Sequence, residues 1–114
     1  MFMIVRRAST FYGRINLTNE NGDGIILSDS DYLIFSVKKS LKTNNANNIV
    51  IHKTLHEYDQ INGSYPFVLS VEDTDIPSGN YFYDVGLQCS NGEFYHVTMP
   101  DLFIIKESIA RKEN

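Results

Sequence analysis

The chain has 114 residues, which suits one domain with one hydrophobic core. Its 14 acidic and 10 basic residues give a formal net charge of -4, which argues against a nucleic-acid-binding module because such a module needs clustered Lys and Arg. The single cysteine, Cys89, cannot form an internal disulfide, and no apolar run approaches the ~20 residues of a membrane-spanning helix. We therefore expect a fold held by packing alone, with no nucleic-acid or membrane partner.

The first half of the chain alternates apolar and polar residues in short segments separated by turn residues. Residues 1–5 can form a short edge strand or an arm that reaches a partner. Clearer alternation predicts strands over residues 11–18, 32–39 and 49–54, because successive side chains of a strand point to opposite faces. Residues 40–48 are rich in asparagine and predict a loop.

The longest alternating segment, residues 76–89, is the strand around which the remaining segments are arranged. It begins with a turn, because Pro77 fixes its own φ and Gly79 permits a positive φ. Asn91 and Gly92 then predict a type I′ hairpin, with residues 93–99 as the return strand.

Residues 65–71 and 101–108 complete a series of seven or eight short strands, and no segment sustains a helical period. This pattern predicts an all-β protein, a single immunoglobulin-like antiparallel β-sandwich over residues 1–109. Residues 110–114 form a charged tail that we expect to be frayed.

A tyrosine corner is predicted at the start of the long strand. In this motif a Tyr hydroxyl bonds to the backbone a few residues upstream, and the spacing from Gly79 to Tyr81 and Tyr83 fits it. The alternative is a binding surface made of Tyr81, Tyr83 and Tyr95. The structural role for Gly79, Tyr81 and Tyr83 is favoured, because the alternation places both tyrosines on the apolar face.

No segment carries a recognised catalytic or cofactor motif. His52 and His56 have the spacing of a zinc-protease helix, but Lys53 stands where the catalytic Glu belongs. The acidic turns do not match a calcium-binding loop, and Cys89 has no activating neighbour in the local sequence. We expect a protein that is not an enzyme and that holds no cofactor or metal.

Two segments resemble a known family. Residues 31–38, Asp-Tyr-Leu-Ile-Phe-Ser-Val-Lys, resemble an Asp-x-hydrophobic-x-Phe-x-Val-Lys strand, and residues 76–85 resemble Leu-x-x-Gly-x-Tyr-x-Tyr-Asp-Val, with Ile76 in place of the usual Leu. Residues 103–105 add a final Phe-x-Ile strand. In this order, from about residue 11 to residue 105, the chain is similar to small phage and prophage virion proteins. The likeness is to the immunoglobulin-like N-terminal domain of siphophage baseplate upper proteins in particular.

The resemblance implies a structural protein of a phage tail or baseplate, found in the virion and made in the cytoplasm of the bacterial host. Its partners would be other virion structural proteins or further copies of itself, and the family implies no catalytic residue. The candidate contact residues are Phe2 and Ile4, if the N-terminal segment is an arm, and the outward aromatics Phe82 and Phe94.

Two alternatives stay open. The first is a β-sandwich module that binds a carbohydrate or a cell-surface ligand through Tyr12, Tyr58 and Tyr95. The second is a small enzyme, which would need a pocket that holds Cys89, or a histidine, beside an acidic side chain.

Overall fold

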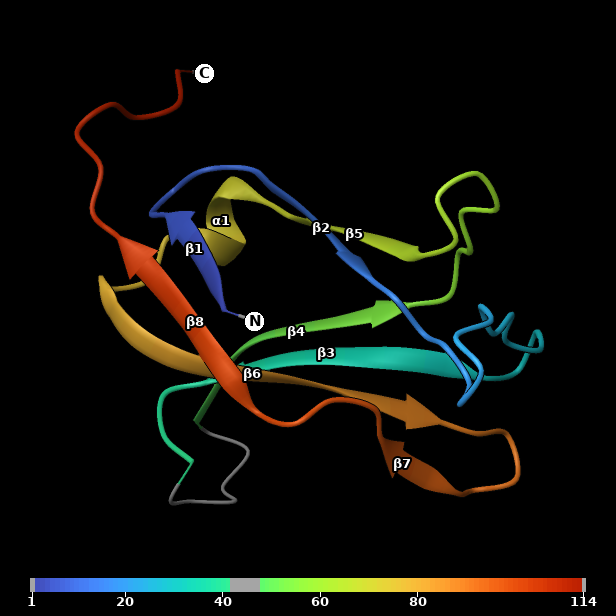
Figure 1. Cartoon of the computed structure of the whole chain (residues 1–114). Coiled ribbons are helices and arrows are strands. Elements are labelled where there is room, and N and C mark those ends of the chain that lie inside the picture. Colours follow the sequence, from blue (N-terminus) through green and yellow to red (C-terminus); the bar gives the residue numbers. More distant parts are fainter. Residues whose placement is uncertain (1, 42–47, 114) are drawn as a thin grey trace.

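The computed structural model describes residues 2–41 and 48–113, which are nearly all β-structure (Figure 1). The all-β class is therefore as predicted, whereas most of the predicted loop over residues 40–48 lies outside the described residues, as do residues 1 and 114. In chain order the elements are β1 (Met3–Arg6), β2 (Phe11–Ile15), β3 (Tyr32–Lys38), β4 (Ile49–Leu55), β5 (Tyr65–Leu69), α1 (Val71–Thr74), β6 (Gly79–Gln88), β7 (Phe94–His96) and β8 (Asp101–Lys106).

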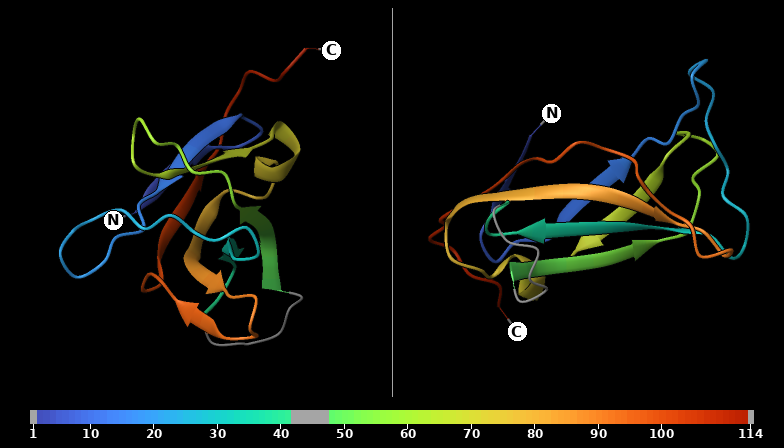
Figure 2. Two further views of the ribbon diagram at one scale, coloured as in Figure 1. Left: turned by 90° about the vertical axis from the view of Figure 1, so that its right-hand side faces the viewer. Right: turned by 90° about the horizontal axis from the view of Figure 1, so that it is seen from below.

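Six of these strands form one curled sheet in the order β1-β8-β6-β3-β4, with β7 paired to the far half of β6. β1 runs parallel to β8, and the other pairs of this sheet are antiparallel. β2 and β5 form a separate antiparallel ribbon. The ribbon lies across one face of the large sheet, so that the sheet has a covered inner face and an outer face (Figures 1 and 2).

The core lies between the large sheet and the ribbon. Leu33, Phe35 and Val37, the inward positions predicted for β3, are fully buried. The ring of Phe35 stacks on that of Phe67 in β5 with 4.6 Å between their centroids, which joins the two layers. The other core residues are Val5, Ile15, Leu17, Ile51, Leu55, Tyr65, Leu69, Tyr81, Tyr83, Val85, Phe103 and Ile105.

The turn before β6 has the geometry of a tyrosine corner. The Tyr81 hydroxyl donates a hydrogen bond of 2.6 Å to the carbonyl oxygen of Pro77, and Gly79 adopts a φ of 151°, which favours glycine. Tyr81 and Tyr83 are 5% and 8% exposed, and burial raises the pKa of both hydroxyls. These three residues therefore support the fold rather than a surface site.

The expectation of a strand through residue 71, and of no helix, is wrong. The strand ends two residues earlier, and Ser70 caps the single helical turn α1. The Ser70 hydroxyl accepts from the Asp73 N–H, and the Asp73 carboxylate accepts from the Ser70 N–H. This reciprocal capping box satisfies two N–H groups that would otherwise be unpaired, and the chain turns into a helix where the apolar alternation alone predicts strand.

The hairpin between β6 and β7 also differs from the expectation. A type I′ turn requires a positive φ at both central residues, but φ is positive at Gly92 (94°) and not at Asn91. The Gly92 N–H donates to the Cys89 carbonyl, and the Cys89 N–H donates to the Glu93 carbonyl. The connection is therefore a type I turn followed by a left-handed glycine, and the return strand is shorter than residues 93–99.

Both ends of the described chain are tied to the fold. Of the two alternatives for the N-terminal segment, the structure shows the edge strand, because β1 pairs with β8. Residues 110–113, part of the expected frayed tail, have no regular secondary structure. Arg111 nevertheless lies 3.6 Å from a carboxylate oxygen of Asp75 and 3.7 Å from one of Glu107.

Candidate interaction surface

The outer face of the large sheet carries apolar side chains that the core does not use. The strand registers place Ile4 beside Ile104 and Phe82 beside Leu102, and all four alternate with buried residues. Ile4 is 52% exposed, and Phe2, directly before β1, is 55% exposed, while the other three are half-buried. We call these five residues the outer apolar band. The right panel of Figure 2 looks onto the part of this face formed by β6, β3 and β4.

The charged side chains at outward positions of this face are mainly basic. Arg6 and Lys106 are direct neighbours in the β1–β8 register, and Lys38 lies beside Phe82. The carboxylate at an outward position in these strands is Asp84, on β6. These outward positions therefore hold three cations and one carboxylate, although the chain as a whole has a net charge of -4. A face with this charge would attract acidic groups.

A cavity of about 230 Å³ opens beside the outer apolar band and is lined in part by Ser36, Phe82, Asp84 and His96. Ser36 has Asp84 as its neighbour on β6 and His52 as its neighbour on β4. A catalytic triad needs the histidine between the serine and the acid, whereas here the serine lies between the acid and the histidine. The order Asp84, Ser36, His52 across the three strands is therefore not the order of a catalytic triad.

Phe94 is partly used for packing. Its ring lies over Gly86, so close that a Cβ atom on that glycine would be 2.2 Å from the Phe94 Cζ atom. The ring also meets His96 edge-on, with 5.3 Å between the ring centroids. Because 46% of Phe94 stays exposed, the residue extends the outer face as well as covering β6.

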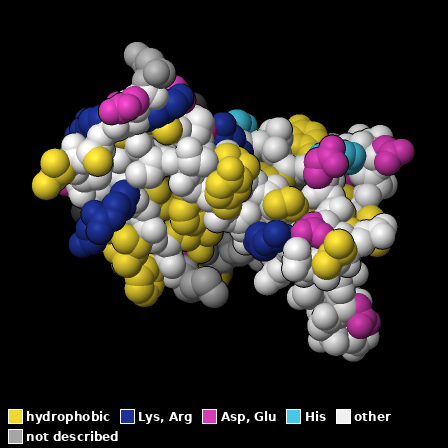
Figure 3. All heavy atoms as spheres, turned by 90° about the horizontal axis from the view of Figure 1, so that it is seen from above, with side chains coloured by type: hydrophobic (Ala, Val, Ile, Leu, Met, Phe, Trp, Pro, Cys, Tyr) yellow, Lys and Arg dark blue, Asp and Glu magenta, His cyan; other side chains and the backbone are white. Residues whose placement is uncertain are grey.

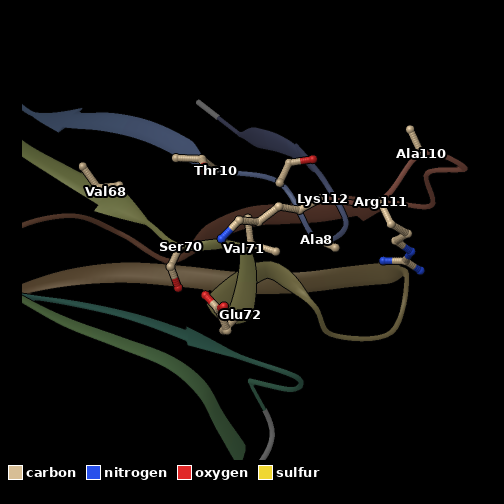
Figure 4. Close-up of a pocket in the computed structure, with 10 residues that line it drawn as sticks. Ala8, Thr10, Val68, Ser70, Val71, Glu72, Ala110, Arg111 and Lys112 are labelled. Carbon is tan, nitrogen blue, oxygen red and sulfur yellow. The ribbon is translucent and has the colours of Figure 1, made fainter. Parts of the chain in front are cut away.

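A larger groove, of about 710 Å³, lies between the β1–β2 turn, α1 and the C-terminal segment (Figure 4). Figure 4 shows the side chain of Lys112 extending across it toward α1. Glu72 and Arg111 supply the other charged groups of its lining, and the remaining lining side chains are small or apolar. The groove is therefore an open surface between three chain segments that carries one acidic and two basic side chains.

The three tyrosines of the carbohydrate alternative have different environments. Tyr12 is 77% exposed on β2 and lines a cavity whose walls include neither of the other two. Tyr58 packs against the buried Tyr65, with 5.2 Å between the ring centroids. Tyr95 is held on the hairpin by a hydrogen bond of 2.7 Å from its hydroxyl to the Glu93 carboxylate.

Cys89 and His56, which belong to the enzyme and metal alternatives, both lie near Asp31. Burial, with the nearby carboxylates of Asp31 and Glu93, raises the pKa of the Cys89 thiol and so disfavours the reactive thiolate. The Nδ1 atom of His56 lies 3.0 Å from the backbone carbonyl oxygen of Asp31. Within the described ranges, no group of three or more His, Cys, Asp or Glu side chains is placed to hold a metal ion.

Sequence reasoning identified part of the outer face and missed the rest. It named Phe2, Ile4, Phe82 and Phe94, but not Leu102, Ile104 or the Arg6 and Lys106 pair. The available signal was the unbroken apolar run of residues 102–105, which indicates apolar side chains on both faces of one strand. The parallel pairing of the first and last strands had no local signal.

Comparison with known proteins assigns no family to the chain. No protein-family model matches it, and no curated protein is found as a relative. Among the described residues, the structure has no helix with the length and apolar character required to cross a bilayer.

Proposed function

We propose that the protein is a non-enzymatic structural or assembly component of a phage or prophage particle, of the tail or baseplate type. It binds other virion proteins through the outer face of its large sheet. The observation that carries the proposal is the outer apolar band, which stays accessible although the inner face of the same sheet is fully packed. A contiguous accessible apolar surface with a polar rim is typical of protein interaction sites.

The strand order supports an immunoglobulin-like sandwich as the scaffold. In the variable-type arrangement one sheet holds strands G, F, C and C′ side by side, and the facing sheet holds B and E. β8, β6, β3 and β4 follow that order in space and in the chain, and β2 and β5 take the places of B and E. The tyrosine corner falls at the start of β6, the place of strand F.

The phage assignment is supported by where the family-like segments lie. Residues 31–38 run into and through β3, and residues 76–85 cover the tyrosine corner and much of β6. These two strands pair with each other at the centre of the large sheet, with Phe35 opposite Val85. The resemblance to baseplate upper proteins therefore concerns the central strands of the scaffold rather than scattered surface positions.

The size of the molecule is compatible with an interface on one face. A standard protein interface buries about 800 Å² on each partner, roughly a tenth of the 7630 Å² accessible surface of the described chain. Such an interface acts by burial and needs no covalent chemistry.

Particles purified from the strain that encodes the chain test the proposal. We expect mass spectrometry to find the chain in the particles, and Ile4→Glu to reduce its incorporation by about tenfold or more, because a charge replaces an anchor of the interface. Tyr12→Glu, which places the same charge on the exposed side of the ribbon, is the matched control. Absence of the wild-type chain from particles, or equal loss in both variants, contradicts the proposal.

A further inference from the structure

The outer edge of β1 is available for a further strand. β1 ends the strand order of the large sheet and pairs on one side with β8. The Arg7 N–H donates to the Lys106 carbonyl at 2.7 Å, which shows that odd-numbered residues direct their backbone groups to β8. By alternation, Ile4 and Arg6 direct their N–H and C=O groups to the open side. A strand added there could pair its backbone N–H and C=O groups with those of Ile4 and Arg6.

The side chains beside this edge define what such a strand must contain. Ile4 contributes an exposed apolar side chain, and the next outward positions of β1 and β8 place Arg6 directly beside Lys106. Within the part of the chain that the structure describes, the ion pairs of this end engage Arg7 and Arg111, not Arg6 or Lys106. Like charges in direct register repel each other, so an incoming carboxylate would relieve an existing repulsion.

The surface around the ends of β1 and β8 carries further charged side chains. Figure 3 looks onto the molecule from the ribbon side and shows Lys and Arg side chains at the end where β1 and β8 finish, together with Asp and Glu and next to hydrophobic side chains. Asp75 and Glu107 neutralise Arg7 and Arg111 there, which leaves Arg6 and Lys106 as cations outside these ion pairs in a chain of net charge -4. An acidic segment is therefore attracted to this end and not to the molecule as a whole.

We infer that the open edge of β1 binds an extended segment of a partner protein that alternates apolar and acidic residues and adds to the sheet as a strand. The inference rests on the proposed assembly function and names the chemistry of the partner. A second copy that paired through its own β1 would bring two arginines and no carboxylate in residues 2–7. An anionic lipid surface would match the cations but would leave the backbone groups of Ile4 and Arg6 without partners in register.

A synthetic peptide of about eight residues that alternates Glu and Val is the probe, and a peptide that alternates Lys and Val is its control. We expect the Glu peptide to shift the backbone amide NMR signals of Ile4 and Arg6, and its affinity to fall several-fold between about 50 and 300 mM salt. The double variant Arg6→Glu with Lys106→Glu should weaken binding by about tenfold or more. Lys39→Glu, directly after β3, is the single-charge control away from the β1 edge and should leave binding unchanged.

A second pair of variants tests strand addition itself. Ile4→Pro removes the N–H that faces the open edge, whereas Ile4→Ala truncates the same side chain and keeps that N–H. We expect Ile4→Pro to bind the Glu peptide at least several-fold more weakly than Ile4→Ala does, with the amide spectrum of β8 retained in both. Equal affinities would overturn strand addition.

Three other outcomes would overturn the inference. They are equal binding of the Glu and Lys peptides, a concentration-dependent dimer with protected Ile4 and Arg6 amides, and binding to vesicles with about 30% phosphatidylglycerol in place of the peptide. If Ile4→Glu blocks incorporation into particles but the Glu peptide does not bind, the assembly function stands and the acidic-strand partner is wrong.

Discussion

Two side chains, Tyr65 and Asp59, hold the loops at one end of the molecule. The hydroxyl of the fully buried Tyr65 donates to the Ile25 carbonyl and accepts from the Leu27 N–H, each at 2.8 Å. This clamps the loop between β2 and β3 to the core. Asp59 accepts from the Arg14 guanidinium at 2.8 Å, which ties the loop between β4 and β5 to the ribbon.

The titration of Asp59 gives the first prediction. Hydrogen bonds from the side chains of Asn62 and Arg14, and from backbone N–H groups, lower its pKa from 3.8 to about 2. Because the folded pKa lies below the unfolded one, the stabilisation is complete above pH ~4 and is lost as the pH falls through about 2. We expect Asp59→Asn to be less stable than wild type at pH 5 and the difference to shrink as the pH falls from 4 to 2.

Urea unfolding at a series of pH values measures this difference in the free energy of unfolding. NMR titration of the Asp59 side-chain carboxyl carbon checks the cause directly. A titration midpoint near 4 in the folded protein, or a difference between the proteins that does not change with pH, would contradict the prediction.

At the scale of elements, two glycines allow aromatic rings to lie flat against a neighbouring strand. A Cβ atom on Gly13 of β2 would be 2.2 Å from the Cζ atom of Phe67, and one on Gly86 of β6 would be 2.2 Å from that of Phe94. Phe67 is buried and stacked on Phe35, whereas Phe94 is 46% exposed on the hairpin. We therefore expect an added Cβ atom to be tolerated less well at Gly13 than at Gly86.

We expect Gly13→Ala to lower the free energy of unfolding by about 1–3 kcal/mol, because Phe67 is buried and stacked on Phe35, so that a shift of its ring disturbs the core. Gly86→Ala should cost less than about 1 kcal/mol, because Phe94 can rotate into solvent. Urea unfolding of both variants measures the difference. A Gly86→Ala variant that is destabilised as much as Gly13→Ala would show that the β6–β7 hairpin is more rigid than its exposure indicates.

At the scale of the whole molecule, a cluster of aromatic rings joins the layers. Phe35 lies in its middle, with centroid distances of 4.6 Å to Phe67, 5.6 Å to Tyr83 and 6.3 Å to Phe103. These partners come from β5, β6 and β8, so one side chain contacts both layers. The stack of Phe35 on Phe67 is therefore one of the core contacts that hold the two-stranded ribbon on the sheet.

We expect Phe35→Ala to cost about 3–5 kcal/mol, a large part of the ~5–15 kcal/mol that stabilises a typical domain. Phe82→Ala, on the outer face, is the matched control and should cost about 1 kcal/mol or less. Near-UV circular dichroism and urea unfolding compare the two variants. Equal destabilisation would mean that Phe82 is part of the folded core and not free for a partner.

Local patterns predicted local features well. The alternation in residues 32–38 and 79–88 identified the buried faces of β3 and β6, and the spacing from Gly79 to Tyr81 identified the corner. The helical turn after Leu69 was missed because Val71 continues the apolar alternation, although the capping pair Ser70 and Asp73 was readable in the sequence. The hairpin type was missed because it depends on the φ angle of Asn91, which residue identity alone does not determine.

The sequence by itself determined the class of the fold and the inner and outer residues of most strands, because the side-chain period of a strand is a property of its own few residues. The tertiary structure decided which strands are neighbours. It brought the first strand beside the last, and so gathered Ile4, Ile104, Arg6 and Lys106 into one surface. Pairing between segments so far apart depends on how all the layers pack together, and no local pattern contains it.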